Sequence, residues 1–379
     1  MKEKKCLDYG IPIFKLDEKT VSSDSWHDWR WHIANRIKDI NNIKKISSIP
    51  NTALYDKVIG KYHFATTPYY FRLIKKFDYT DPVFRQVIPS TEELTVHIKG
   101  SDPDPLAEGS HSPLPYLVHR YPDRVLIITT GICASYCRHC NRKRYWDSRP
   151  WVINLKQLQR ICDYIKTHRQ VREVILSGGD PLFLNTNYLE TILKKIRGIR
   201  HVEIIRIGSR IPVVLPMRIT KRLCGMLKKY RPIWLNTHFN HPVELTKEAE
   251  HAADMLSLHG IPVSNQTVLL KGVNDSADTL ARLFTGLQRI LIRPYYLFHC
   301  DAVEGTDHFR TALKTGIEIM TTLEGKIGGL CLPKFVVDLP NGQGKAPAGP
   351  CFLIRTEDNT AVFRTWEGEI MTYQGANGS

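Results

Sequence analysis

The sequence has no long apolar segment. None of its uninterrupted apolar runs approaches the roughly 18 to 20 residues that a membrane-spanning helix requires. The first ten residues, MKEKKCLDYG, are basic, but no apolar segment follows them, which is unlike a secretory signal. We therefore expect a cytoplasmic protein with no membrane partner.

Acidic residues are too few to balance the basic ones. The chain has 53 Lys and Arg residues against 38 Asp and Glu residues, which gives a formal net charge of +15. Such a charge can indicate nucleic-acid binding, and basic runs such as RKR at 142–144 would suit it. These runs are scattered, however, and none forms a long basic arm. We expect no nucleic-acid partner, and we attribute the charge to solvated surface and to a site for anionic cofactors.

Cysteine is sparse outside one short segment. The chain has nine cysteines, and three of them lie in GICASYCRHCNRKRY at 131–145, whereas the others are well separated. An odd number of cysteines without a secretory signal favours reduced thiols over a disulfide framework.

A repeated pattern of short β-rich runs begins near residue 125. The segments between the runs have helical periodicity, as at 278–291 and at 245–256, where Gly260 would cap the helix. Most intervals between the runs are roughly 30 residues, the length of a βαβ unit. Six such units predict a parallel sheet, and spacing alone does not distinguish an open sheet from a barrel. The runs are VLIITT from Val125, EVILS from Glu173, HVEIIRIG from His201, PIWLNTHF from Pro232, PVSNQTVLL from Pro262 and IRPYYLFH from Ile292.

The flanking segments differ from this repeat. Residues 1–98 are expected to be mostly helical, with Trp26 and Trp29 of a predicted helix at 24–40 packed against the body. Residues 99–118 are rich in Pro, Ser, Gly and Asp and indicate a connector to the α/β region at 119–349. Residues 350–379 alternate in polarity around a turn at Asp358–Asn359, which predicts a β-hairpin extension.

The cysteine segment directly follows the first β-rich run. In parallel α/β folds the carboxyl ends of the strands form the ligand-binding face, so Cys133, Cys137 and Cys140 lie where a site is expected. Three thiolates complete a tetrahedral zinc site only with a fourth ligand, such as His139. They can instead hold three irons of a [4Fe–4S] cluster and leave the fourth iron open. The spacing, with three and then two intervening residues, is that of radical S-adenosylmethionine enzymes.

A second segment, SGGD at 177–180, ends the next run. Glycines let the backbone approach a ligand closely, and the Asp180 carboxylate suits the ammonium group of S-adenosylmethionine. Taken alone, SGGD is more often an ordinary turn. Its place one strand after the cysteines favours a functional role.

A third segment, FVVDLPNGQGKAP at 335–347, places a lysine beside glycines. Lys345 follows a strand that ends in Asp338, at the expected mouth of the site. Most loop lysines are merely solvated. A lysine near a glycine-rich loop is nevertheless what pyridoxal phosphate requires for covalent attachment.

Taken together, these motifs resemble the lysine 2,3-aminomutase family of radical S-adenosylmethionine enzymes. The similarity runs from about Thr67 to at least Lys345 and includes, in family order, HRYPDRVL, CRHCNRKR, LSGGD, IRIGSR, LNTHFNHP, RPYYLFHCD and FVVDLPNGQGK. The resemblance implies a partial (β/α)6 barrel of the radical S-adenosylmethionine type. It also implies an isomerase that uses a [4Fe–4S] cluster, S-adenosylmethionine and pyridoxal 5′-phosphate to interconvert L-lysine and β-lysine.

The resemblance gives a role to each matching residue. Cys133, Cys137 and Cys140 would hold the cluster, and Lys345 would form the Schiff base with pyridoxal phosphate. Arg142 would bind the substrate carboxylate, while Asp301 and Asp338 would bind the distal ammonium group. The remaining residues are Arg120, Tyr121 and Arg124 for pyridoxal phosphate, His139, Ser177, Gly178, Gly179, Asp180 and Gln266 for S-adenosylmethionine, and His238 in a supporting role.

The two aspartates indicate the substrate. A carboxylate substrate such as glutamate would face two others in a desolvated site, which is prohibitive, so lysine is favoured. Arginine stays open, because a guanidinium also pairs well with carboxylates. Further alternatives are an aminomutase that serves β-lysylation of a translation factor, a radical S-adenosylmethionine enzyme that modifies nucleic acid, and a non-catalytic zinc scaffold.

The chain departs from the family pattern at three places. Asn341 and Gln343 interrupt the usual glycine run, which suggests an altered loop path since Gln adopts positive φ less readily than Asn. Asn141 replaces a threonine or phenylalanine. No cysteine follows Cys351, so we expect no structural zinc and no oligomer built on a zinc-binding tail, although a homo-oligomer is compatible with the resemblance. An electron donor such as flavodoxin or ferredoxin is implied.

Overall fold

The computed structural model describes residues 21–44, 47, 49, 52–146 and 150–375. The basic start of the chain and Cys6 lie outside the described residues. No helix in the described residues is long and apolar enough to cross a membrane. None of the eight cysteines within these ranges forms a disulfide, in agreement with the prediction of reduced thiols.

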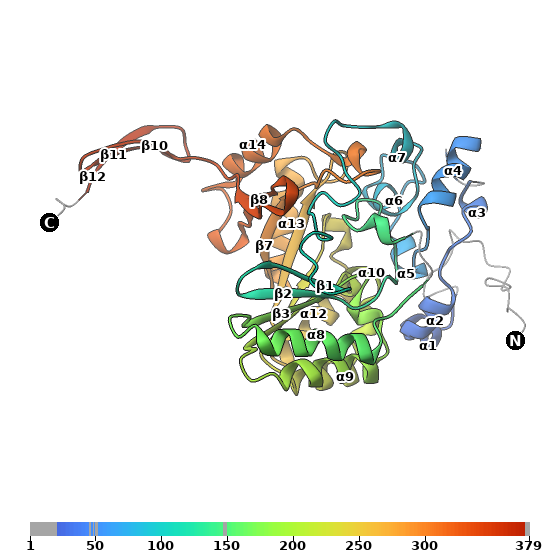
Figure 1. Ribbon diagram of the computed structural model, residues 1–379. Coiled ribbons are helices and arrows are strands. Elements are labelled where there is room, and N and C mark those ends of the chain that lie inside the picture. The colour runs from blue at the N-terminus through green and yellow to red at the C-terminus, as the bar shows by residue number, and fades with distance from the viewer. Residues whose placement is uncertain (1–20, 45–46, 48, 50–51, 147–149, 376–379) are drawn as a thin grey trace, which may run out of the picture.

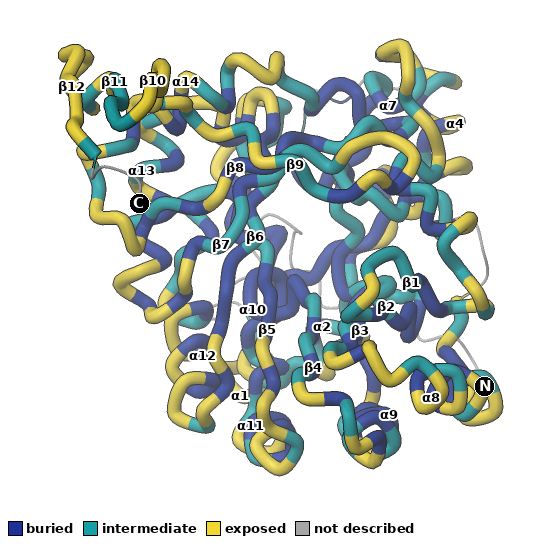
Figure 2. The backbone as a smooth tube through the Cα atoms, turned by 60° about the vertical axis from the view of Figure 1, so that its left-hand side comes forward, coloured by how far each residue is buried: buried dark blue, intermediate teal, exposed yellow. Residues whose placement is uncertain are grey.

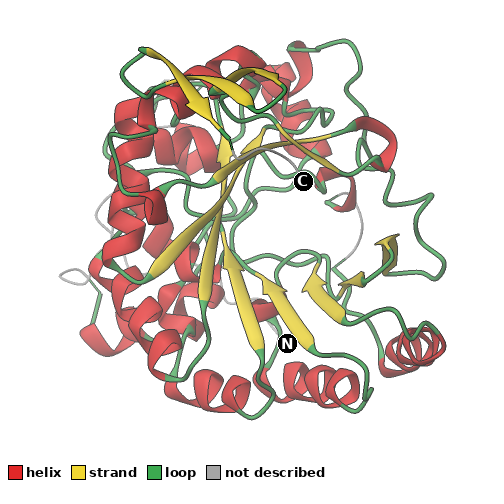
Figure 3. Cartoon of the chain, turned by 90° about the vertical axis from the view of Figure 1, so that its left-hand side faces the viewer, coloured by secondary structure: helices red, strands yellow, loops and turns green. Residues whose placement is uncertain are grey.

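The main sheet has nine strands in the order β1 to β9, so every strand lies beside its neighbour in sequence. Strands β2 to β8 are parallel, while β1 and β9 pair antiparallel at the two edges. The sheet curves around a central space without closing (Figure 3). The strands are β1 (Leu117–Tyr121), β2 (Arg124–Ile128), β3 (Glu173–Ser177), β4 (Ile204–Gly208), β5 (Ile233–Thr237), β6 (Val263–Leu269), β7 (Ile292–His299), β8 (Lys334–Asp338) and β9 (Lys345–Pro347).

This arrangement confirms the predicted partial α/β barrel. The six β-rich runs of the sequence became β2 to β7, and β8 extends the parallel series by one strand. Because all the parallel strands point the same way, their carboxyl ends meet at one rim of the sheet.

Helices cover the outer face of the sheet (Figure 3). Each of the five helices after β2 to β6 is preceded by a capping residue, whose side chain accepts a hydrogen bond from a backbone amide of the first turn. The capping residues are Asn154, Asn185, Thr220, Thr246 and Ser276. The five helices are α8 (Leu155–Thr167), α9 (Thr186–Arg197), α11 (Lys221–Lys228), α12 (Lys247–Leu258) and α13 (Ala277–Arg289), and the short α10 (Ile211–Val214) and the later α14 (Leu313–Leu323) complete the set.

The helical periodicity predicted the buried faces well and one helix end poorly. Leu280, Leu283 and Leu287 of α13 are fully buried against the sheet. The helix ends at Arg289, however, and Leu291 adopts a positive φ of 59° and is largely exposed. The prediction that Leu291 belongs to this face was therefore wrong, because the chain turns sharply there to enter β7.

The segment before β1 consists of short helices. The helix predicted over 24–40 is interrupted at Asp28, whose side chain accepts a hydrogen bond from the Arg30 amide and so begins α2. Trp26 is fully buried and Trp29 packs partly against the core, as predicted. The helices are α1 (Ser23–His27), α2 (Trp29–Ala34), α3 (Asn41–Lys44), α4 (Ala53–Lys61), α5 (Pro68–Phe71), α6 (Pro82–Val87) and α7 (Glu92–Thr95).

The last described segment forms a separate three-stranded sheet that extends away from the body (Figure 1), and its two outer strands are exposed (Figure 2). The predicted turn at Asp358–Asn359 joins β10 (Leu353–Glu357) to β11 (Thr360–Arg364). A second turn, with Gly368 at a φ of 97°, leads into β12 (Ile370–Gln374). The extension is therefore a three-stranded meander rather than the hairpin that we expected.

Candidate functional site

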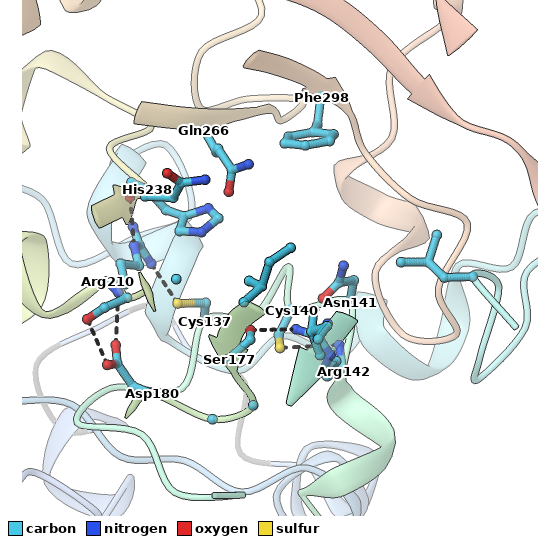
Figure 4. Close-up of a pocket in the computed structure, with 18 of the residues that line it drawn as sticks. Cys137, Cys140, Asn141, Arg142, Ser177, Asp180, Arg210, His238, Gln266 and Phe298 are labelled. Atoms are coloured by element: carbon cyan, nitrogen blue, oxygen red, sulfur yellow. Dashed lines mark hydrogen bonds between the residues drawn. The ribbon is translucent and has the colours of Figure 1, made fainter. Parts of the chain in front are cut away.

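A cavity of about 600 Å³ opens at the carboxyl ends of the parallel strands. It is lined by residues from both edges of the sheet and from the loops after the strands (Figure 4). All the site residues predicted from the sequence line it, which gathers positions from Arg120 to Lys345 in one place. Their individual roles stay predictions, and their surroundings are described below.

The cysteine loop is positioned by the two glycines of SGGD. A side chain at Gly178 would collide with the Thr130 carbonyl oxygen, and one at Gly179 would collide with the Ile132 backbone. In addition, the Asp180 amide donates a hydrogen bond of 2.9 Å to the Ile132 carbonyl oxygen. The glycines therefore permit close packing of the loop that leads into Cys133, in addition to lining the cavity.

The three thiols fit a cluster better than a single ion. Burial and the neighbouring Cys137 raise the pKa of Cys140 to about 11, and burial together with nearby negative groups raises the pKa of Cys133 well above its usual value. Thiolates at these positions need the positive charge that bound iron supplies. In the described part of the chain, no three His, Cys, Asp or Glu side chains converge as ligands of one metal ion. Cluster ligands need not converge, because each thiolate binds a different iron.

Arg210 is a site residue that the sequence analysis missed. Its Nη1 donates a hydrogen bond of 2.8 Å to the Cys137 sulfur (Figure 4), and its Nη2 lies 2.8 Å from a Glu244 carboxylate oxygen. It also donates to Gln86 and Tyr70. Arg210 thus brings a buried positive charge to Cys137, one of the three predicted cluster ligands. It is the last residue of IRIGSR, one of the motifs shared with the family, and the sequence analysis predicted no role for it.

The Asp180 carboxylate forms hydrogen bonds with other groups of the protein. Its carboxylate accepts hydrogen bonds from the Ser209 hydroxyl at 2.7 Å, the Arg210 amide at 2.8 Å and the Leu182 amide at 3.0 Å. Burial raises the pKa of Asp180 to about 6 despite these donors. The carboxylate therefore ties the loop after β3 to the loop after β4. Its predicted contact with an ammonium group stays a prediction.

His139 presents a nitrogen suited to a ligand. The residue is half-buried, and its Nε2 lies 3.2 Å from the Asn240 side-chain amide. Its Nδ1 is buried and has no hydrogen-bond partner among the described residues. Burial and neighbouring cations hold the pKa of His139 well below its usual value, so the ring is neutral. A buried, unpaired nitrogen in the cavity wall fits a bound polar group such as S-adenosylmethionine.

Lys345 lies opposite Asp338 across the β8–β9 pair. The Lys345 ammonium is 3.0 Å from Asp338 Oδ1, and the Arg120 guanidinium is 3.6 Å from the same oxygen. Asp301 completes the group from the end of β7. Burial and the nearby Asp338 charge raise the pKa of Asp301 to about 7, although Asn141 donates a hydrogen bond of 3.2 Å to its Oδ2.

The loop before Lys345 accommodates both departures from the glycine run. Asn341 takes a positive φ of 58°, which asparagine tolerates, whereas Gln343 has an ordinary φ of −68°. The other two residues of the loop with a positive φ are the glycines Gly342 and Gly344. Neither replacement opposes the backbone path, so the altered loop path suggested by the sequence is not required.

Arg120, Tyr121 and Arg124 form a cationic cluster at the β1–β2 edge. The Arg124 guanidinium lies 3.8 Å from the centre of the Tyr121 ring, and that of Arg120 lies 5.0 Å from it. A Cβ at Gly344 would lie 3.3 Å from the Tyr121 hydroxyl, so the chain beside Lys345 runs close to this cluster. Two guanidinium groups near one primary amine fit the phosphate and aldehyde ends of pyridoxal phosphate.

Arg142 has a partner that the sequence did not reveal. Its Nη2 lies 2.6 Å from Glu108, its Nε also donates to Glu108, and its Nη1 donates to the Ser177 hydroxyl at 3.1 Å. Burial disfavours the Glu108 carboxylate, but the charges of Arg142 and Arg144 lower its pKa to about 2. Glu108 belongs to the segment expected to be only a connector. This segment therefore contributes to the cavity wall and orients Arg142.

A buried ion network supports the cysteine loop from outside. Glu93 of α7 lies 2.5 Å from the Arg138 guanidinium and 2.6 Å from the Lys143 ammonium, and all three side chains are at most 1% exposed. Arg138 and Lys143 flank Cys140 in sequence. The network therefore fixes both sides of the third cysteine to the helical region before β1.

Replacing Glu93 with alanine leaves two buried cations without their carboxylate. We expect Glu93→Ala to lower the free energy of unfolding by about 3–5 kcal/mol, measured by urea denaturation. A matched control is Glu304→Ala, which removes a partly exposed pair with Lys61 and should cost about 1 kcal/mol or less. Equal losses in the two variants would contradict a structural role for the network.

Comparison with known proteins finds relatives that match most of this chain. The family model for the radical SAM superfamily matches residues 127–284, and the model for lysine-2,3-aminomutase matches residues 320–378. An L-lysine 2,3-aminomutase from Acetoanaerobium sticklandii is 46% identical over 93% of this chain and 86% of its own length. One from Clostridium subterminale is 46% identical over 94% and 86%, respectively. A glutamate 2,3-aminomutase from Clostridioides difficile is 38% identical over 95% and 86%.

Proposed function

Because this chain belongs to the lysine 2,3-aminomutase family of radical S-adenosylmethionine enzymes, we propose that it is an isomerase that interconverts L-lysine and β-lysine. The observation that carries this proposal is the pair of carboxylates, Asp301 and Asp338, which line the same cavity as Arg142. A recess of this kind suits the distal ammonium group of lysine.

The chain's own residues hold and orient the reactants. Arg142, with Nη1 directed to Ser177, binds the substrate carboxylate, and the two aspartates bind the ammonium group at the other end of the molecule. Fixing both ends of the substrate places its reacting carbons at a constant position between the cysteine loop and Lys345.

Cys133, Cys137 and Cys140 would hold the cluster, and Lys345, with Arg120 and Arg124 nearby, would hold pyridoxal phosphate. When bound, the cluster and S-adenosylmethionine supply a 5′-deoxyadenosyl radical, and pyridoxal phosphate supplies the conjugation that lowers the energy of amino migration from C2 to C3. Aromatic residues of β7, Tyr295, Tyr296 and Phe298, line the same cavity and limit the access of water.

Two alternative substrates follow from the comparisons and the chemistry. Glutamate, the substrate in the name of one relative, would bring a third carboxylate toward Asp301 and Asp338, which is unfavourable in a buried site. Arginine is the stronger competitor, because a guanidinium pairs well with carboxylates. A role in supplying β-lysine for modification of a translation factor would use the same reaction.

The proposal is tested by anaerobic turnover. The protein with its cluster reconstituted is given pyridoxal phosphate, S-adenosylmethionine and dithionite, and separately lysine, arginine or glutamate. Chromatography with mass detection should find the β-amino isomer from lysine only. No isomer from any of the three, despite full iron content and bound pyridoxal phosphate, would contradict the proposal.

Turnover with lysine should depend on the ionisation of Asp301. Burial and the Asp338 charge raise the pKa of Asp301 to about 7, against the opposing effects of Asn141, Lys345 and Arg142, so the carboxyl group is protonated at lower pH. The lysine ammonium stays charged throughout this range. We therefore expect the KM for lysine to rise about tenfold for each pH unit below 7.

Steady-state kinetics between pH 6 and pH 9 at saturating S-adenosylmethionine would measure this effect. Asp301→Asn should bind lysine weakly at every pH and lose the dependence. Because the pKa is raised by folding, the protonated Asp301 contributes stability that is present at low pH and lost as pH rises through about 7. A KM that is flat across this range in the unaltered protein would argue against Asp301 as the ammonium ligand.

We also propose that the reaction takes place in the cytoplasm with an electron donor such as flavodoxin or ferredoxin. Free thiols and a cluster that is active only in its reduced state support a reducing compartment. A homo-oligomer stays a prediction, which light scattering would test.

A further inference from the structure

Asn141 lies between the third cysteine and the arginine proposed for the substrate carboxylate. Its side-chain Nδ2 donates a hydrogen bond of 3.2 Å to Asp301 Oδ2. In Figure 4 it lies beside Arg142, across the cavity from His238 and Gln266. The loop after Cys140 thus supplies Arg142, proposed for one end of the substrate, and contacts Asp301, proposed for the other end.

Each of the two aspartates has one carboxylate oxygen already in use. The Asn141 amide occupies Oδ2 of Asp301. At Asp338, Oδ1 lies 3.0 Å from the Lys345 ammonium and 3.6 Å from the Arg120 guanidinium. The Arg120 contact does not depend on Lys345. The recess therefore offers one oxygen from each carboxylate rather than a complete carboxylate.

This division of oxygens suits an ammonium group. A guanidinium pairs best through two parallel hydrogen bonds to both oxygens of one carboxylate. An ammonium is a compact charge whose three donors point in different directions, so it can bond one oxygen of each aspartate. The recess thus favours the end group of lysine over that of arginine.

We propose that Asn141 is a specificity-determining residue that selects a terminal ammonium over a guanidinium by occupying one oxygen of Asp301. The inference rests on the proposed function, since it takes Asp301 and Asp338 as the groups that bind the distal end of the substrate. The Asn141 donor also opposes the rise that burial and Asp338 cause in the pKa of Asp301, and Lys345 and Arg142 act in the same direction as Asn141. It therefore favours the ionised carboxylate that a cation requires.

The test replaces Asn141 with leucine, which has a similar size and no donor. The kcat/KM values for lysine and arginine are measured in the holoenzyme, together with the inhibition constant of arginine against lysine. Loss of one hydrogen bond to a charged group is worth roughly tenfold or more, so we expect the ratio of lysine to arginine kcat/KM to fall by roughly that factor. Arginine should also inhibit more strongly.

A matched control is Asn236→Leu, at another asparagine that lines the cavity, on β5. Any effect of that change on cofactor binding should lower kcat/KM equally for lysine and for arginine. The ratio of the two kcat/KM values should therefore stay unchanged. If Asn141→Leu fails to retain iron, Asn141→Ala replaces it in the same comparison. An unchanged ratio in the iron-loaded variant would overturn the proposal and leave Asn141 as a structural residue of the loop. Absence of lysine turnover in the unaltered protein would instead contradict the proposed function.

Discussion

Lys345→Ala should abolish turnover of lysine, with kcat lower by at least roughly a thousandfold, as is typical when an attacking group is removed. The change removes the amine that would hold pyridoxal phosphate and deprives Asp338 of a cation at 3.0 Å. The visible absorption of bound pyridoxal phosphate should disappear together with activity. Both quantities are measured on the same preparation, the first by absorption spectroscopy and the second by the isomer assay.

A suitable control is Lys334→Ala, which removes an exposed lysine from the start of β8, the strand that pairs with β9. This variant should keep its absorption and its activity. A Lys345→Ala protein that retained covalently bound cofactor would show that another amine forms the attachment.

Cys137→Ala should lower bound iron and sulfide sharply and eliminate turnover. Each cysteine would hold a different iron, so two thiols leave one iron without a protein ligand. The loss should exceed the 10- to 100-fold that is typical when an outer-shell partner of a metal ligand is removed. It should also deprive the buried Arg210 of one hydrogen-bond acceptor, while Glu244 continues to pair with it.

Iron and sulfide analysis after anaerobic reconstitution would measure the effect. The control is Cys351→Ser, since this thiol is exposed and lies outside the cavity. Circular dichroism of both variants distinguishes loss of the cluster from loss of the fold. Full iron content in Cys137→Ala would refute the assignment of this cysteine as a ligand.

The sequence predicted the parts of this structure that follow a local pattern. Strands β2 to β7 alternate with amphipathic helices at regular intervals, and the cysteine spacing and Lys345 lie in short motifs, so each could be read from neighbouring residues alone. Glu93, Glu108 and Arg210 could not be predicted in this way. They are single charged residues in short helices or loops, and their partners lie far away in the sequence.

The loop at 341–344 shows a different limit. Composition alone suggested that Gln343 disturbs a run of glycines. The backbone needs a positive φ at Asn341, Gly342 and Gly344 but not at Gln343. Which positions of a tight turn require glycine depends on dihedral angles that the surrounding strands β8 and β9 impose, and no residue pattern states them.

The strictly sequential order of the main sheet has a consequence for biosynthesis. Since each strand pairs with the one made just before it, the sheet can grow from one edge to the other as the chain leaves the ribosome. The cysteine loop follows β2 near one edge of the sheet, whereas Lys345 begins β9, the last strand of the sheet to be made. A chain whose translation stops before β9 would present its cysteines but have no lysine for pyridoxal phosphate. Attachment of that cofactor therefore reports that synthesis of the whole barrel is complete.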